Sequence, residues 1–527
     1  MRKIAYGILV LIAIGTLYGG VKHVLERIEI GPAKRAVLEI KADLDRAPVD
    51  ATAAVSAPET QPNIIIIMAD DLGWRDVSYN QSEIQTPVMD RLAREGITLN
   101  RFYVQPSCSP TRAALMTGKS PMRLGIINPI TKNNPTGLPL SEVTIADRLR
   151  GVGYQTALIG KWHLGARNLA YHPNERGFDY FYGNVTGGVS FFNKTHGGGY
   201  DWQRNGRTVR EEGYTTHLLA EEAIAQIESR DRERPLFMFV SFGAPHLPNE
   251  APEETIQAYR KIGNQNRRVH AAMVSELDTA IGEIHAALVA NDIADETLIW
   301  FMSDNGGLIV DNPARFIPDP FFTNLVESHL GVETNKAMIE FTRYNLSNGG
   351  SDNRPFRKGK GSVYEGGVRV PSFMYWPSEL APNSYNYMTT VQDVVPTLMT
   401  LAGAADDTTF DGRDLFAALK TNRPAPAKDY ITRIDVLADS TAIYRYPFKL
   451  LQVNDKVELF EIEQDPLETR NIADSNPDLV RNLLAAIQAF PRGESIAIPT
   501  QDAVNDVDTF GGEEDREPWA EQAYWQD

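Results

Sequence analysis

The chain has almost no cysteine. Cys108 is the only one among 527 residues, which excludes an intramolecular disulfide and the small domains that disulfides stabilise. The default interpretation of such a residue is a small buried hydrophobe. However, Ser107, Ser109 and Pro110 surround Cys108, and "TRAALMTG" after them predicts the first turns of a helix. A cysteine where a loop enters a helix faces backbone N–H groups, and that environment favours an anion or a nucleophile.

Positive charge is also scarce. The formal net charge is -17, which excludes a general nucleic-acid binder because such a protein needs a basic face. Part of this charge lies in 501–527, where Arg516 is the only basic residue among many acidic ones. We expect this acidic tail to be solvated, with docking through Trp519 and Trp525 as the alternative.

One long uncharged run is present near the N-terminus. Residues 4–21, "IAYGILVLIAIGTLYGGV", follow Arg2 and Lys3, and as a helix they would span roughly 27 Å. We expect 1–25 to be a membrane anchor whose positive end is cytoplasmic, with a cleavable signal peptide as the alternative. The rest of the chain would then lie in the periplasm or at the cell surface, or be secreted after cleavage. The Ala-, Pro- and Thr-rich segment 26–61 has the composition of a stalk.

Paired carboxylates follow a strongly apolar strand. In "NIIIIMADDLGW", Ile64–Met68 is a continuous β-branched run typical of a strand buried on both faces of a sheet, and Asp70 and Asp71 come just after it. Adjacent carboxylates repel each other unless a positive charge, such as a divalent cation, lies between them. A helix cap or turn before Gly73 is the alternative interpretation.

The same pattern recurs far along the chain. The predicted strand Leu298–Met302 is followed by Asp304 and Asn305. Because sites in an open α/β sheet form at the carboxyl ends of strands, both pairs of side chains can meet at one metal ion. Four oxygen ligands favour Ca²⁺ or Mg²⁺ over zinc.

Two further predicted strands lead into basic side chains. Thr156–Ile159 precedes Lys161 and His163, and Leu236–Phe242 precedes His246. Each of these residues alone is more typical of a surface charge or a structural histidine. Four strands that all end in polar side chains favour one shared site.

Taken together, these segments resemble the formylglycine-dependent sulfatases of the arylsulfatase B-like (N-acetylgalactosamine-4-sulfatase-like) kind. From about 63 to 473 the motifs "ADDLGW", "CSPTRAALMTGK", "GYQTALIGKWHLG", "APHLP", "SDNGG" and "GKGSVYEGGVRVP" appear in the family's order. The resemblance implies an α/β, alkaline phosphatase-like fold in which a large mixed sheet lies between helices. This catalytic domain would span 62–428, and a C-terminal subdomain over 429–500 would hold an antiparallel sheet with a hairpin within 444–462.

The resemblance also implies the chemistry. A formylglycine-generating enzyme would oxidise Cys108 to an aldehyde, and the hydrate of that aldehyde would attack the sulfur of a sulfated sugar or an aryl sulfate. Modified Cys108 would share one Ca²⁺ with Asp70, Asp71, Asp304 and Asn305. Arg112 would support the charged diol, and Lys161 and Lys360 would bind sulfate oxygens. His163 would take up the proton of the diol, and His246 would protonate the leaving oxygen. Lys358 is the nearest alternative to Lys360, which we choose for its distance from "EGG".

Two segments depart from the family pattern or leave alternatives open. The expanded segment 308–357 would form a rim or lid over the pocket, and the Gly- and aromatic-rich segment 181–202 would be either a wall for sugar rings or a structural loop. The main functional prediction is a sulfatase for sulfated glycans. A phosphodiester or phosphonate monoester hydrolase of the same superfamily is the second hypothesis, and an anchored glycan-binding protein that is never matured is the third.

Overall fold

The computed structural model describes residues 61–132, 134–196, 199–309, 350–404, 409–435 and 438–496. All of them fall in one of the chain's two compact units, Ala54–Asp527. The predicted anchor, nearly all of the stalk, the acidic tail and most of the segment 308–357 lie outside the described residues, so these interpretations and the domain boundaries stay predictions. Within the described ranges, no helix has both the length and the apolar character needed to cross a membrane.

A mixed ten-stranded sheet forms the centre of the described unit. Strand β1 (Asn63–Ala69) pairs in parallel with β10 (Leu236–Ser241) on one side and β11 (Thr297–Ser303) on the other, and β4 (Gln155–Gly160) pairs in parallel with β10. The strand order is β14-β2-β13-β11-β1-β10-β4-β5-β8-β9. The six outer strands are β14 (Asn383–Tyr385), β2 (Ile97–Leu99), β13 (Ser372–Tyr375), β5 (Tyr180–Gly183), β8 (Gln203–Arg204) and β9 (Arg207–Thr208). Because β13 runs antiparallel to β11, the sheet is mixed, as the sequence predicts.

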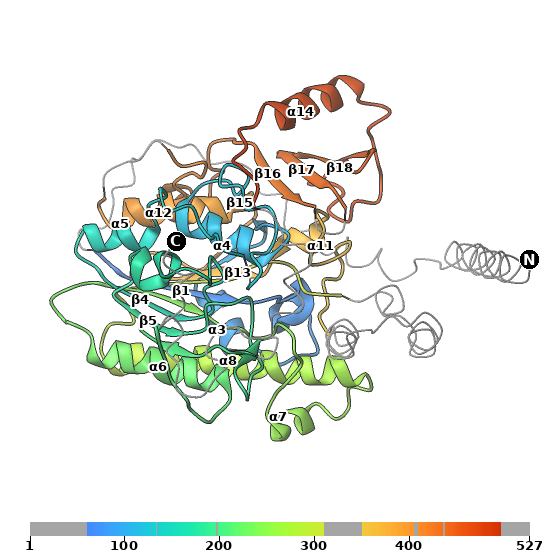
Figure 1. The fold of residues 1–527 in the computed structure, drawn as a ribbon. Helices are drawn as coiled ribbons and strands as arrows, with labels where there is room; N and C mark the ends of the chain where they lie inside the picture. The colour runs from blue at the N-terminus through green and yellow to red at the C-terminus, as the bar shows by residue number, and fades with distance from the viewer. Residues whose placement is uncertain are drawn as a thin grey trace, which may run out of the picture. The chain divides into compact units, whose positions relative to one another are not determined.

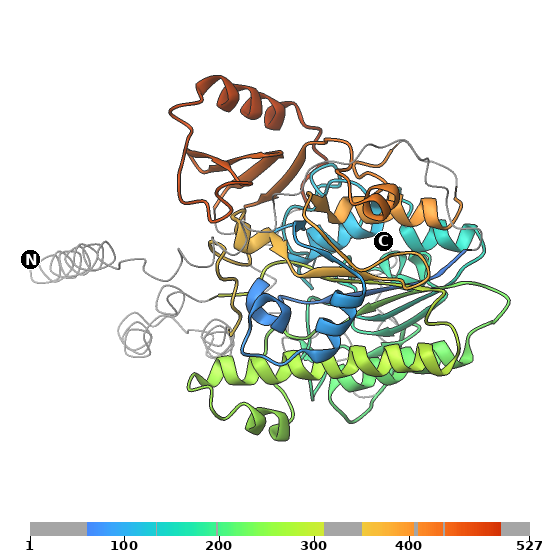
Figure 2. The same ribbon diagram turned by 180° about the vertical axis from the view of Figure 1, so that it is seen from behind.

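Helices cover both faces of this sheet (Figures 1 and 2). Alternate side chains of β1 enter opposite cores, with Ile64 and Ile66 on one face and Ile65 and Ile67 on the other. The first core includes side chains of α4 (Cys108–Thr117), α5 (Ile145–Gly151), α12 (Val394–Leu401) and α13 (Phe416–Thr421). The second includes side chains of α3 (Pro87–Glu95), α6 (Thr215–Ser229) and α8 (Gln265–Ala290). This burial on both faces explains the uninterrupted apolar sequence of β1.

A four-stranded antiparallel sheet follows near the C-terminus, and its order is β16 (Tyr430–Ile434), β17 (Ser440–Arg445), β18 (Phe448–Val453) and β19 (Lys456–Glu461). The predicted hairpin is confirmed, because β18 pairs antiparallel with β19. One face packs against Leu483 and Ile487 of α14 (Pro477–Ala489), above β16–β18 in Figure 1. The other face packs against the body, where it meets Tyr103 and Val368. The alkaline phosphatase-like α/β fold is thereby confirmed, including its C-terminal sheet.

The register of the central strands decides where the site forms. Met68 near the end of β1 lies opposite Ser241 of β10 and Met302 of β11, and Val240 lies opposite Ile159 of β4. The residues that follow these four parallel strands therefore emerge at the same edge of the sheet.

We expect Ile66→Ala to lower the free energy of unfolding by about 2–5 kcal/mol, because truncation leaves a cavity in a closely packed core. Ile66 is 0% exposed, whereas Val289 is 52% exposed and serves as the control. Val289→Ala should change the free energy by no more than about 0.5 kcal/mol in the same urea titration. Equal effects of the two substitutions would contradict the described core.

Candidate active site

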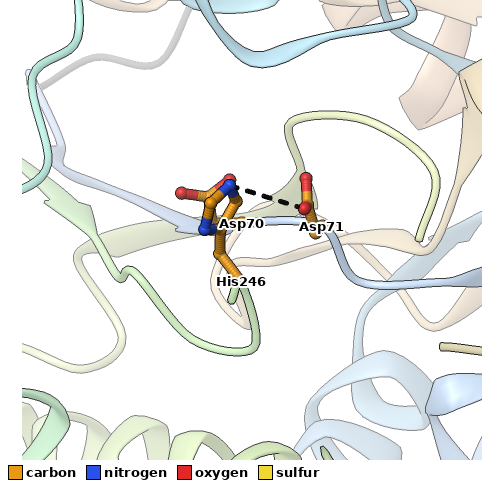
Figure 3. Close-up of side chains that lie close together, drawn as sticks. All are labelled: Asp70, Asp71 and His246. Carbon is orange, nitrogen blue, oxygen red and sulfur yellow. Dashed lines mark ion pairs between the residues drawn. The ribbon is translucent and has the colours of Figure 1, made fainter. Parts of the chain in front are cut away.

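The residues after β1 and β11 meet as the sequence predicts. Asp70, Asp304 and Cys108 each offer a ligand atom, and these atoms lie within 4.8 Å of one another; the same holds for Asp70, Asp71 and His246. Figure 3 shows the second group, with the contact between His246 and Asp71 drawn as a dashed line. Asn305 joins the cluster because its Nδ2 donates to Asp71 Oδ1 at 2.6 Å.

The cluster holds buried oxygen atoms with unused acceptor capacity. Asp70 Oδ1 and Asn305 Oδ1 have no hydrogen-bond partner within the part of the chain that the structure describes. Burial, together with the negative charge of Asp70, raises the pKa of Asp304 to about 7. Both observations indicate a local deficit of positive charge, because buried polar atoms and repelling carboxylates are costly unless they are satisfied. The donor atoms at hand are mainly carboxylate and amide oxygens, which fit a hard divalent cation.

Two lysine side chains lie against these carboxylates. Lys161 Nζ is 2.5 Å from Asp70 Oδ2, and Lys360 Nζ is 2.7 Å from Asp71 Oδ1. Burial raises the pKa of Asp70, but the charge of Lys161 and other nearby cations outweighs burial, so this pKa lies below its usual value. Burial lowers the pKa of Lys360, but the charges of Asp71 and the other acidic groups around it together outweigh burial, so this pKa is raised. Lys358, the alternative considered above, is exposed.

Arg112 connects three of the strand ends. Its Nη2 and Nε contact Asp304 Oδ2 at 2.9 and 3.1 Å, and its Nη1 donates to the carbonyl oxygen of Lys161 at 2.9 Å and to Ser241 Oγ at 2.6 Å. Arg112 is fully buried and thus fixes the spacing of β11, β4 and β10 at this edge. Ser241 was not among the predicted site residues, although it is a polar residue at the end of β10, which is the signal that indicated the others.

Cys108 is the first residue of α4 and is 2% exposed. Burial raises the pKa of its thiol, and the charges of Lys161 and Lys360 do not compensate. Because the thiolate and not the thiol is the nucleophile, Cys108 in its unmodified form is poorly suited to attack a substrate. Cys108 is buried, as expected of a small hydrophobic residue. That interpretation does not explain why carboxylate, lysine and arginine side chains surround it.

Hydrogen bonds orient His163. Its Nε2 lies 3.0 Å from the carbonyl oxygen of Ile130, and since a carbonyl only accepts, Nε2 carries the ring proton. Its Nδ1 is buried and has no hydrogen-bond partner among the described residues. Burial, together with the charges of Lys161 and Arg112, lowers the pKa of His163. The ring is therefore a neutral base whose acceptor nitrogen is available.

His246 is oriented in a similar way. Its Nδ1 lies 2.6 Å from the carbonyl oxygen of Leu247, so this nitrogen carries a proton, and its Nε2 lies 3.7 Å from Asp71 Oδ2. Burial and the charge of Lys360 lower the pKa of His246. The two histidines thus present different nitrogens, Nδ1 of His163 and Nε2 of His246, for proton transfer.

Comparison with known proteins identifies this arrangement. The sequence profile of the sulfatase family matches residues 62–404. The chain belongs to the sulfatase family. It is 34% identical over 412 residues to arylsulfatase J of Mus musculus, covering 75% of this chain and 61% of that protein. It is 29% identical over 421 residues to N-acetylgalactosamine-6-sulfatase of Homo sapiens, covering 74% of this chain and 71% of that protein.

A solved structure is similar over most of its length. The crystal structure of Ps i-CgsB in complex with k-i-k-neocarrahexaose has a TM-score of 0.72 and 30% sequence identity, covering 83% of this chain and 94% of that one. The sulfatase family is a family of sulfuric ester hydrolases, so membership gives this chain its enzyme class. These comparisons do not distinguish the arylsulfatase B-like branch from other sulfatases.

A glycine pair in this sulfatase packs against both histidines. A Cβ atom added to Gly187 would lie 2.7 Å from His163 Nε2, and one added to Gly188 would lie 3.4 Å from His246 Nδ1. The following residues and the loop that bears His246 enclose a small, mostly apolar hollow lined in part by Val189, Phe191, Leu247 and His246 itself. Residues 187–191 therefore lie directly beside the two histidine rings.

We expect Gly187→Ala to reduce kcat/KM for sulfate ester hydrolysis on the order of tenfold or more, because the added methyl group displaces the His163 ring. Gly151→Ala is the matched control, since a Cβ atom there meets nothing within 4 Å. Steady-state kinetics of both variants, with unfolding temperatures as a check on folding, test this expectation. Wild-type kinetics for Gly187→Ala would show that the His163 position is not critical.

Proposed function

We propose that this protein hydrolyses sulfate esters of a sulfated glycan, using formylglycine at position 108 and one bound Ca²⁺. The observation that carries the proposal is the convergence of Cys108 with a carboxylate cluster and two buried or nearly buried lysines at one sheet edge. A metal site built from oxygen ligands, beside fixed cations, suits the hydrolysis of an ester in which negative charge develops on the transferred group and on the leaving oxygen.

Asp70, Asp71, Asp304 and Asn305 would hold the Ca²⁺. Asp70 Oδ1 and Asn305 Oδ1, which have no hydrogen-bond partner among the described residues, support this assignment, as does the raised pKa of Asp304. When bound, the cation would act as a Lewis acid that stabilises negative charge on the reacting oxygens. A cation on the carboxylates would also weaken the hold of Asp70 and Asp71 on Lys161 and Lys360, which would leave both ammonium groups for sulfate oxygens.

The family motif around Cys108 supports its conversion to formylglycine by a formylglycine-generating enzyme, and the raised pKa of the thiol makes the unmodified residue a poor nucleophile. When present, the hydrated aldehyde would supply an oxygen nucleophile in place of the thiol. Arg112 would support the charged group at position 108 from the same helix. Nδ1 of His163, which is neutral and unpartnered among the described residues, would accept a proton from that group.

His246 would act on the leaving oxygen. Its Nδ1 is committed to the carbonyl oxygen of Leu247, so a second proton would reside on Nε2, beside Asp71. The lowered pKa of His246 makes the protonated ring a stronger acid, which favours proton transfer to the departing alkoxide. The alcohol part of the substrate would accordingly lie beside His246, next to the hollow lined by Val189 and Phe191.

A glycan is the substrate class that we favour over an aryl sulfate. The similar structure of Ps i-CgsB was solved with k-i-k-neocarrahexaose, and this likeness supports a sulfated sugar as substrate. We extend the proposal to an arylsulfatase B-like specificity. We also propose a location outside the cytoplasm, through an anchor or signal segment over 1–25, on the basis of the sequence alone.

The first test is the peptide mass of the Cys108 region from protein purified from its native host, measured alongside sulfate release. We expect an aldehyde at position 108 and release of inorganic sulfate from sulfated oligosaccharides, with Cys108→Ala as the inactive control. An unmodified thiol throughout would favour the binding-protein hypothesis. Turnover of phosphonate or phosphodiester substrates without sulfate release would favour the second hypothesis.

Calcium binding is tested separately by thermal unfolding. We expect a chelator to abolish sulfate release and added Ca²⁺ to restore it and raise the unfolding temperature, because binding stabilises only the folded state. Asp304→Asn should weaken Ca²⁺ binding on the order of tenfold, since it removes one ligand charge. Asp478→Asn is the control, because Asp478 is exposed on α14. A Ca²⁺-independent unfolding temperature for the wild type would contradict the metal site.

A further inference from the structure

A second cluster of buried charges lies outside the proposed catalytic residues. Lys449 on β18 is 0% exposed, and its ammonium group contacts Glu365 Oε1 at 3.0 Å and Glu468 Oε1 at 2.7 Å. Glu365 is the first residue of α11 (Glu365–Val368), whereas Glu468 follows the C-terminal sheet. The cluster therefore joins the C-terminal sheet to the body of the protein.

Glu365 is at the centre of this cluster. Its carboxylate accepts from the hydroxyl groups of Tyr103 at 2.9 Å and Tyr444 at 3.3 Å, and Arg369 Nη1 lies 3.6 Å away. Two carboxylates thus face two cations, and every contact is buried. Such a group contributes little net stability compared with apolar packing of the same volume, but it fixes geometry because each partner accepts only a narrow range of positions.

The segment just before α11 carries Lys360. The backbone N–H of Glu365 donates to Glu468 Oε2 at 3.0 Å, which holds the end of this segment from the C-terminal side. The N–H of Lys360 donates to the carbonyl oxygen of Gly307 at 3.1 Å, next to the loop of Asp304 and Asn305. The N–H of Gly361 donates to the carbonyl oxygen of Pro106 at 2.8 Å, two residues before Cys108.

The same segment is closed on itself. Gly366 N–H donates to the carbonyl oxygen of Arg357 at 2.9 Å, and Gly367 N–H donates to that of Tyr364 at 2.8 Å. A Cβ atom on Gly366 or Gly367 would lie within 2.3 Å of a carbonyl oxygen, so the turns pack without spare room. A shift of Glu365 would therefore be transmitted to Lys360, five residues earlier, rather than absorbed between them.

We propose that Lys449 and Glu468 are positioning residues, which hold Glu365 and through it set the ammonium group of Lys360 where the sulfate group binds. The proposal rests on the proposed function for the identity of the bound group. Neither residue touches the carboxylate cluster of the active site. Their effect would reach the reaction only through the segment 357–367.

The test compares Lys449→Met, Lys449→Arg and Lys420→Met. Lys420 on α13 pairs with Glu379 at 2.7 Å and is a matched lysine outside the segment 357–367. Kinetics are normalised to the fraction of enzyme that carries the aldehyde, and each variant is crystallised. We expect Lys449→Met to lower kcat/KM on the order of tenfold to a hundredfold, Lys449→Arg to recover most of it and Lys420→Met to change it less than about twofold.

The crystal structures separate this proposal from the proposed function. In crystals of Lys449→Met and of the wild type grown under the same conditions, we expect Lys360 Nζ to occupy different positions relative to Asp71 Oδ1. A lower unfolding temperature with Lys360 unmoved and kcat/KM unchanged would overturn the positioning role and leave a purely structural cluster. If the wild type releases no sulfate, the proposed function fails, and the position of Lys360 still decides the positioning role.

A milder variant covers the case in which Lys449→Met does not fold. Glu468→Gln preserves the shape of the side chain and an acceptor for the N–H of Glu365, but it weakens the hold on Lys449. We expect a smaller loss of kcat/KM than for Lys449→Met, with the same displacement of Lys360 in the crystal structure. Unchanged kinetics together with an unmoved Lys360 would overturn the proposal.

Discussion

The site depends on the neutralisation of three buried carboxylates at one edge of a sheet. Each has its own cation: Lys161 for Asp70, Lys360 for Asp71 and Arg112 for Asp304. Repulsion within the group persists despite this pairing, since the pKa of Asp304 is still raised to about 7 by burial and by Asp70. Under the proposed function, a divalent cation bound here would remove that repulsion and would at the same time free the lysines for an anion, so metal binding and anion binding would support each other at this edge.

Much of this arrangement was predictable because it follows from strand register. A strand buried on both faces has an uninterrupted apolar sequence, and parallel neighbours end at a common edge, so polar residues just after Met68, Met302 and Ile159 had to meet. The C-terminal hairpin followed from the alternation of apolar runs and turns, whereas the fold class was implied by the resemblance to the sulfatase family. Cys108 and Arg112 were different, because their place in the site was indicated by a family motif and not by any strand.

The remaining features left no local signal. The partners of the histidine rings are carbonyl oxygens of Ile130 and Leu247, and a backbone atom is present at every position whatever the residue. The contact of Glu365 with Lys449 joins residues that are far apart in the sequence. Glutamate and lysine are usually exposed, so neither residue alone indicates a buried ion pair. The close approach of Gly187 to His163 was not predictable either, because the composition of a glycine-rich segment does not indicate which side chain it will contact.

The carboxylates of the site and Lys360 are held in place by different parts of the structure. This difference gives the C-terminal sheet a role in positioning Lys360. Asp70 and Asp304 have short side chains on the ends of central strands, where the backbone is fixed by pairing on both sides. Lys360 has a long, flexible side chain on a loop, so its position depends on whatever holds that loop. The body of the protein holds this loop through hydrogen bonds to the carbonyl oxygens of Gly307 and Pro106. Lys449 on the C-terminal sheet and Glu468 hold it through a third point, Glu365. A sheet that contributes no residue to the carboxylate cluster can therefore still determine where an anion meets the site.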